Sequence, residues 1–302
     1  MAPWKPGSLN CCSRRNGGFA NNWWRPPRIN LDRLPRLRSC NSGVPFRAVA
    51  GVGLVTATGA SALYVAGGGG LIPGRSSNEL GHPSRRLTDL LLALNCSVFV
   101  ANLAMGGDKL LVMGAKVNSA ILAGQWWRLL TATTLHGGVL HLLVNCVSLS
   151  NIGPLLERIS GQERFAAVYA LSGLTGSLAS FCFNSHPSVG ASGAIFGLGG
   201  ALAVFFYRHR ELMGDYSERV LNQLGMNLLI NFGFGLLSRS IDNWAHFGGM
   251  LGGAIVAWLL GPRLVLRRSE EGDARRKGKP DVRFEDHPPI PIFASSPRVL
   301  KP

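Results

Sequence analysis

The residues best suited to chemistry lie around Ser192, in the segment Gly190-Ala191-Ser192-Gly193 at the head of an apolar run that reaches Tyr207. Small residues crowd around one hydroxyl, and no charged residue follows until Arg208. A serine inside a helix usually packs or bonds to its own backbone. A serine framed by two glycines at a helix start is less ordinary, so the pattern indicates Ser192 as a candidate nucleophile.

A nucleophilic serine needs a base, and neutral imidazole is the usual proton acceptor near neutral pH. His246 is the candidate because it lies in an apolar segment with Gly249 and Gly253 on one helical stripe. Such a stripe, with Gly193 on the serine's segment, would let two helices approach closely. The spacing therefore predicts that His246 can come within hydrogen-bond reach of Ser192.

Hydrolysis also needs donors for the developing oxyanion. His141 and Asn145 are four residues apart and would share one face of a helix. Together with the backbone N–H of Ser192 they are the predicted oxyanion donors. The acids within the apolar spans are few (Asp89, Glu157, Asp242) and none neighbours these residues in sequence, so a Ser-His dyad is predicted rather than a triad.

Metal or cofactor chemistry is not indicated. The chain has no HExxH motif, its six cysteines are scattered without a CxxC pair, and Asp89 and Asp242 stand at span ends rather than at the middle of spans. We therefore expect no metal and no cofactor.

The elements that must position these residues are membrane spans. The composition, 46% hydrophobic and 16% charged, is typical of a membrane protein. Apolar runs of about bilayer length, uncharged except for Asp89, predict an all-α polytopic bundle of six helices, at 87–105, 139–156, 165–183, 191–207, 220–237 and 244–261. A further apolar segment, 48–72, is rich in glycine, and the sequence leaves open whether it is an additional span or part of a removed leader.

The distribution of basic residues predicts how the chain is oriented in the membrane and does not indicate a nucleic-acid partner. Of the 31 basic residues, ten lie in residues 1–75 against one acid, and ten lie in residues 263–302 against six acids. If the six helices alternate, the basic loops share one side of the membrane, which is the inner side by the positive-inside rule. The nucleophile, the histidine and the oxyanion donors then enter the membrane from the opposite side.

These residues resemble the rhomboid family of intramembrane serine proteases, which carry HxxxxHxxxN, GxSG and AHxxGxxxG in this order. The segments here are His136 to Asn145, Gly190 to Gly193, and Ala245 to Gly253. The resemblance covers roughly residues 85–262. It implies a six-helix rhomboid-like fold and a serine endopeptidase that acts on transmembrane proteins in the bilayer.

Carried over position by position, the resemblance makes Ser192 the nucleophile and His246 the base. Asn145 and His141 become oxyanion-side residues, and Gly190 becomes a backbone position of the substrate cleft. Trp127 and Arg128 resemble a Trp-Arg element that is structural in the family, and helix spacing predicts structural roles in close helix packing for Gly193, Gly249 and Gly253. With its basic leader, the chain is most similar to plant plastid rhomboid-like proteins.

The expected organisation has four parts. Residues 1–47, rich in arginine and poor in acids, are a predicted organelle transit peptide. Residues 48–84 form the glycine-rich segment and a linker, 85–262 the catalytic domain, and 263–302 a basic, proline-containing disordered tail. A chloroplast inner envelope location is expected, with a mitochondrial membrane as the alternative.

Two other functions are weighed against proteolysis. An inactive rhomboid-like protein that binds client membrane proteins is one, although such relatives lack the serine or the histidine. A transporter lined by His141, Asn145 and His246 is the other, but these residues gather near one surface instead of being strung across the bilayer.

Overall fold

The computed structural model describes residues 82–238, 241–269 and 281–293. The predicted transit peptide, 1–47, and the glycine-rich segment, 48–72, lie outside the described residues. The described part is mostly helical, and this confirms the prediction of an all-α membrane bundle.

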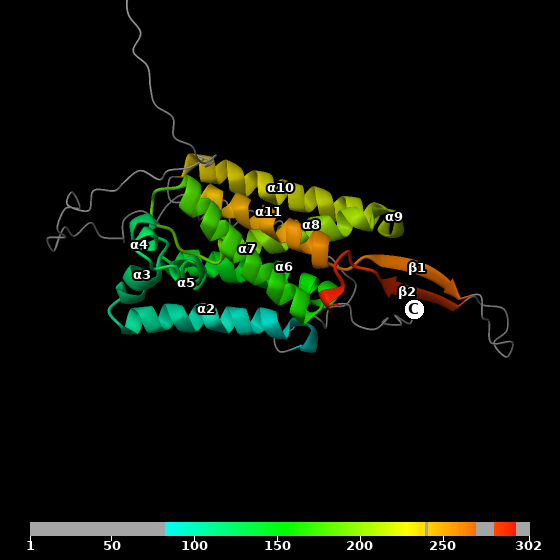
Figure 1. Ribbon diagram of the computed structural model, residues 1–302, viewed down its shortest axis with the longest axis horizontal. Helices are drawn as coiled ribbons and strands as arrows, with labels where there is room; N and C mark the ends of the chain where they lie inside the picture. The colour runs from blue at the N-terminus through cyan, green and yellow to red at the C-terminus, as the bar shows by residue number, and fades with distance from the viewer. Residues whose placement is uncertain (1–81, 239–240, 270–280, 294–302) are drawn as a thin grey trace, which may run out of the picture. The chain divides into compact units, whose positions relative to one another are not determined.

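Six long helices in the described part coincide with the six predicted spans (Figure 1). Their bounds are α2 Arg86–Ala104, α6 Val139–Ser160, α7 Gln162–Phe183, α8 Ser192–Arg208, α10 Asp215–Leu237 and α11 Asn243–Leu260. By length and composition, α6, α7, α10, and α2 together with the preceding turn η3 (Pro83–Arg85) could each cross a membrane. The apolar α8 is shorter, at 17 residues. Its length of roughly 26 Å is less than the roughly 30 Å hydrocarbon core of a bilayer.

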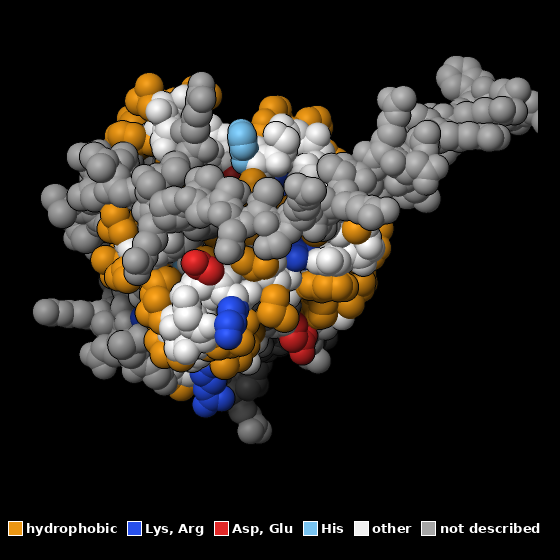
Figure 2. All heavy atoms as spheres, turned by 90° about the vertical axis from the view of Figure 1, so that its left-hand side faces the viewer, with side chains coloured by type: hydrophobic (Ala, Val, Ile, Leu, Met, Phe, Trp, Pro, Cys, Tyr) orange, Lys and Arg blue, Asp and Glu red, His pale blue; other side chains and the backbone are white. Residues whose placement is uncertain are grey.

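The connection between α2 and α6 folds into short helices at one end of the bundle, while the chain after α11 lies at the other (Figure 1). These short elements are α3 Lys109–Gly114, α4 Asn118–Leu122, α5 Arg128–Thr131 and the 3-10 turn η4 Ala132–Thr134. Figure 2 looks onto that end and shows groups of hydrophobic side chains with few charges between them. Val112, Leu122, Trp126 and Trp127 are among the exposed ones, as expected for a segment that meets the membrane interface.

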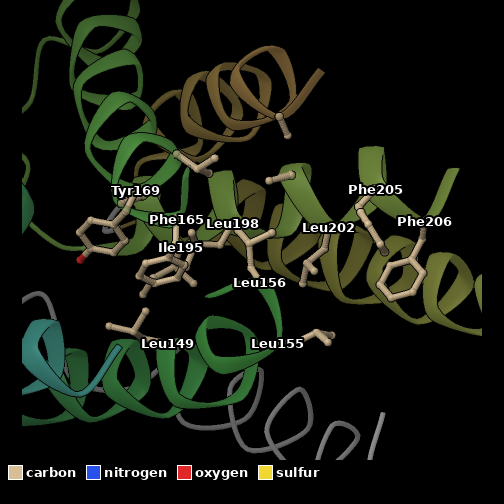
Figure 3. Packing of buried hydrophobic residues seen from close by; sticks show 14 of the residues in the cluster. Leu149, Leu155, Leu156, Phe165, Tyr169, Ile195, Leu198, Leu202, Phe205 and Phe206 are labelled. Atoms are coloured by element: carbon tan, nitrogen blue, oxygen red, sulfur yellow. The ribbon is translucent and has the colours of Figure 1, made fainter. Parts of the chain in front are cut away.

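Helix α8 is the central element, because it packs against α6, α7, α10 and α11. Its side chains form the apolar core with leucines and aromatic residues of α6 and α7 (Figure 3). Leu198 of α8, Leu149 of α6 and Phe165 of α7 are fully buried in this core. The helix that begins with Ser192 is thus packed against neighbours on several sides.

Helices α8 and α11 approach each other through backbone rather than side chains. A Cβ on Gly249 would collide with the backbone of Gly193, and one on Gly253 would collide with the backbone of Gly197. Close packing through small residues replaces the hydrophobic effect as the force that joins helices in a membrane. The stripe seen in the sequence therefore faces α8.

The outer helices α2 and α10 are attached differently. The Glu157 carboxylate of α6 accepts hydrogen bonds from the backbone N–H groups of Leu87 (2.9 Å) and Thr88 (2.9 Å) at the start of α2, which satisfies donors that a helix cannot satisfy itself. Along α10, by contrast, only Ser217 and Val220 are buried in the described structure. The second half of α10 therefore makes few tight contacts with the bundle.

The prediction of a disordered tail after residue 262 is wrong for part of that segment. Strand β1 (Leu264–Ser269) pairs with β2 (Asp281–Asp286) in an antiparallel ladder that aligns Leu264 with Asp286. Asp286 forms an ion pair with the buried Arg164 of α7 (2.6 Å), and the Leu264 N–H donates to Nε2 of His209 (2.8 Å). The basic, proline-containing composition of this segment indicated disorder. Its contacts with α7 and with the end of α8, which lie far away in the sequence, instead hold the two strands in place.

Candidate active site

Ser192 is the first residue of α8, and the chain turns sharply just before it. Gly190 has φ 133°, a conformation that other residues rarely adopt, and its N–H donates to the Ala132 carbonyl (2.8 Å). The first N–H groups of a helix have no intrahelical acceptor. The Ser192 hydroxyl therefore lies at the same end of α8 as the backbone N–H groups that have no intrahelical acceptor.

His246, in the first turn of α11, faces this serine. Its Nε2 lies 2.9 Å from the Ser192 Oγ, a hydrogen-bond distance suited to proton transfer. The imidazole is 8% exposed, and within the described residues its Nδ1 has no hydrogen-bond partner. The observed pair is thus a serine and a histidine without a carboxylate on the second ring nitrogen.

Phe196 holds the imidazole, and sequence reasoning missed it. The two rings are stacked with centroids 4.2 Å apart and an interplanar angle of 7°. Phe196 also makes an edge contact with Phe232 of α10, at 5.6 Å. Its position four residues after Ser192 places it on the same helical face, and this spacing is the signal that could have identified it.

His141 and Asn145 of α6 come to the same end of the bundle. A Cβ placed on Gly190 would lie 2.7 Å from Cε1 of His141 and 3.7 Å from the Ser192 Oγ, so the glycine also makes room for the imidazole. The Asn145 amide donates to the His141 carbonyl (2.8 Å). An amide has a second N–H, which this bond leaves for another acceptor. The oxyanion role of both residues stays a prediction.

His136 completes the histidine cluster. Its ring is 2% exposed and lies edge-on to His141, with centroids 5.3 Å apart. Burial, aided by the nearby His141, lowers the pKa of His136 to about 3. The His136 imidazole is therefore neutral at physiological pH.

Trp127 and Arg128 lie in the connection and do not touch the serine–histidine pair. The Arg128 guanidinium donates to the carbonyls of Ala115 (2.8 Å) and Val112 (2.9 Å), while the Trp127 indole donates to the Met113 carbonyl (3.4 Å). These bonds tie α3 to α5. The contacts fit the structural role expected for the two residues.

Sequence comparison relates this chain to one family. A match to the Rhomboid domain spans residues 123–263. The chain is 42% identical to the rhomboid protease GluP of Bacillus subtilis over 182 residues, which are 58% of this chain and 34% of that protein. It is 34% identical to RHOMBOID-like protein 9, chloroplastic, of Arabidopsis thaliana over 171 residues, 56% of this chain and 38% of that protein.

A shorter relative is covered more fully. The rhomboid YdcA of Bacillus subtilis is 37% identical over 145 residues, which are 47% of this chain and 71% of that protein. By contrast, the chain spans little more than a third of the length of GluP and of RHOMBOID-like protein 9. The similarity therefore concerns the helical domain rather than the whole of the longer relatives.

Proposed function

Because the chain belongs to the rhomboid family of membrane proteins, we propose that it is an intramembrane serine endopeptidase in which Ser192 is the nucleophile and His246 the base. The observation that carries this proposal is the 2.9 Å contact between the Ser192 Oγ and the His246 Nε2, made across two different helices. A serine that merely packed, or bonded to its own helix, would not need an imidazole at this distance. The names of relatives such as the rhomboid protease GluP add support.

In the proposed mechanism, His246 takes the hydroxyl proton as Ser192 attacks the scissile carbonyl carbon. The tetrahedral oxyanion accepts hydrogen bonds from the Ser192 N–H and from the side chains of Asn145 and His141. Protonated His246 then donates its proton to the leaving amine, and an acyl-enzyme remains on Ser192. His246 next deprotonates a water molecule, whose attack releases the acid product and restores the serine.

The substrate class follows from the setting of the site. A transmembrane helix hides its carbonyls in backbone hydrogen bonds, so cleavage requires a segment that unwinds at a polar cavity. The short helix α8, with Ser192 at its first position, supports a site at shallow depth. The sparse packing of the second half of α10 supports lateral entry past that helix. We therefore propose single-span membrane proteins with small or helix-breaking residues near one end of the span as substrates.

A single substitution tests the function. We expect Ser192→Ala to abolish cleavage of a model transmembrane substrate by the purified protein in liposomes, and to abolish labelling by a fluorophosphonate probe. Ser119→Ala, which removes an exposed hydroxyl of α4, is the matched control and should keep both activities. Cleavage retained by the Ser192→Ala variant would refute the assignment. A wild-type protein that binds the substrate without cleavage or labelling would favour the inactive client-binding alternative.

We propose a multi-pass location in a plastid membrane, the chloroplast inner envelope, reached by way of a transit peptide within residues 1–47. The arginine-rich, acid-poor composition of those residues supports this. The similarity to a relative named as chloroplastic adds to it. A mitochondrial membrane is the alternative, since leaders of both organelles share this composition.

A further inference from the structure

Lys116 is a fully buried lysine in the connection between α2 and α6, with no exposed surface. Its ammonium donates to the backbone carbonyls of Asn184 (2.7 Å), His186 (2.8 Å) and Ser180 (3.3 Å), and to the Asn118 side-chain oxygen (3.1 Å). An ammonium has three N–H groups. All of them are therefore directed at oxygens in and beside the loop that follows α7.

The end of α7 gives a physical reason for a cation at this place. The last carbonyls of a helix have no intrahelical partner and carry partial negative charge. Burial lowers the pKa of Lys116, and attraction to the Asp242 carboxylate acts in the opposite direction. The buried ammonium thus contacts the carbonyl dipoles of the loop and is attracted, without a direct contact, by the Asp242 carboxylate.

The backbone of Lys116 is tied to the same loop. Its N–H donates to the Ser188 carbonyl (3.0 Å), and the Ser188 N–H donates back to the Lys116 carbonyl (3.1 Å). Two residues later, the Gly190 N–H donates a hydrogen bond to the Ala132 carbonyl. The loop 184–190 is therefore fixed at several points just before it delivers Ser192 to the start of α8.

A second branch of this polar network reaches the helix that carries the histidine. The Ser180 hydroxyl donates to the Asp242 carboxylate and lies 3.4 Å from the Ser188 hydroxyl. Asp242 is the N-cap of α11, where its carboxylate accepts the Ala245 N–H (3.1 Å) and its carbonyl accepts the His246 N–H (3.2 Å). One polar network therefore joins the loop that precedes Ser192 to the first turn of α11, which carries His246.

We propose that Lys116, acting with Ser180 and Asp242, is a positioning residue that holds loop 184–190 in register with the N-terminus of α11 and so sets the distance between Ser192 and His246. This proposal rests on the proposed function, because it concerns the geometry of that pair. Without the ammonium, the carbonyls at residues 180–186 lose their common donor and the loop relaxes. Displacement of reacting groups by about 1 Å can cost roughly a hundredfold in rate.

The experiment compares Lys116→Met with Lys109→Met in liposomes. Both substitutions remove one positive charge from the same connection, but Lys109 is exposed. Fluorophosphonate labelling is followed to its end point, which gives both a rate constant and the fraction of protein that has a competent site. Cleavage of a transmembrane substrate gives kcat and KM. Ser180→Ala and Asp242→Asn are measured in parallel, because asparagine still caps a helix but carries no charge.

We expect Lys116→Met to reach the wild-type labelled fraction with a labelling rate constant at least about tenfold lower, and kcat to fall by the same factor at an unchanged KM. Ser180→Ala and Asp242→Asn should lower the same rate constant, and Lys109→Met should not. If Lys116→Met does not fold, these two variants carry the test. An unchanged rate constant, or a loss confined to the labelled fraction, would overturn the positioning role. A wild-type protein that is not labelled at Ser192 would instead overturn the proposed function.

Discussion

At the scale of single residues, the imidazole of His246 is oriented by an aromatic ring rather than by a carboxylate. Phe196 stacks on the imidazole at 4.2 Å, and the Nδ1 has no partner within the described part of the chain. In a triad, the acid fixes both the ring orientation and the tautomer of the histidine. Here packing provides the orientation, and α8 supplies both Ser192 and the ring that stacks on His246.

His136 belongs to the same cluster but differs in how it is held. Both ring nitrogens are buried without hydrogen-bond partners within the described residues, and the pKa of His136 falls from about 6.5 to about 3. Between these values the unfolded chain binds a proton that the folded protein does not. Because the unfolded state is then favoured by acid, the stability contributed by His136 is lost as the pH falls below about 6.5.

We therefore predict that His136→Phe reduces the acid sensitivity of the fold. At pH 5 the wild-type protein should lose about 2 kcal/mol of unfolding free energy through this group relative to pH 7.5, and the variant should not. SDS-induced unfolding, followed by tryptophan fluorescence at the two pH values, measures the difference. His186→Gln, at an exposed histidine, is the control. Equal pH dependence in His136→Phe and wild type would contradict the prediction.

At the scale of elements, the contact between α8 and α11 determines whether the pair can form. His246 and Gly249 lie less than one helical turn apart on α11, and Gly249 touches the backbone of Gly193, the neighbour of Ser192. Any side chain at Gly249 must push the two backbones apart. The separation of the helices is therefore coupled directly to the Ser192–His246 distance.

We predict that Gly249→Ala slows fluorophosphonate labelling by at least about tenfold and lowers the unfolding free energy by about 1–3 kcal/mol, as overpacking of a core does. Gly199→Ala is the matched control, because a Cβ at this buried position of α8 meets no atom within 4 Å. That variant should label at the wild-type rate and be as stable or more stable, since alanine favours a helix. Similar behaviour of the two variants would show that the glycine contact does not set the geometry.

The elements differ in how far the sequence could predict them. The six long helices were predictable because each contains a long apolar run with at most one charged residue, and the stripe of Gly249 and Gly253 indicated a close helix contact. The hydrogen bonds from the Lys116 ammonium to the carbonyls of Asn184 and His186 were not predictable. Every residue has a backbone carbonyl, so the residue types of a distant loop do not indicate such acceptors. The β1–β2 pair was also missed, because each strand is only 6 residues long and residues 270–280 separate the two.

At the scale of the whole molecule, the candidate active site and the predicted targeting signal lie in different parts of the chain. The part of the chain from α2 to α11 contains all the candidate active-site residues. The predicted location of the protein rests on residues outside the described ranges. The composition of residues 1–47 predicts import into an organelle but does not by itself separate plastids from mitochondria.

We predict that isolated plastids import the full chain and shorten it, and that isolated mitochondria do not. The arginine-rich, acid-poor segment should be removed on import, and deletion of residues 1–47 should abolish both import and processing. Protease protection and sequencing of the mature N-terminus measure the outcome and also determine whether 48–72 is retained. Processing by mitochondria alone would place the protein in the other organelle.

The strand pair after α11 has a consequence for where the folding unit ends. The Rhomboid match stops at residue 263, but the buried Arg164 of α7 finds its carboxylate at Asp286, on β2. A chain cut at the family boundary would lose that carboxylate, and removing one partner of a buried ion pair typically costs about 3–5 kcal/mol. The cooperative unit of this protein therefore extends through Asp286, some twenty residues beyond the boundary suggested by sequence similarity.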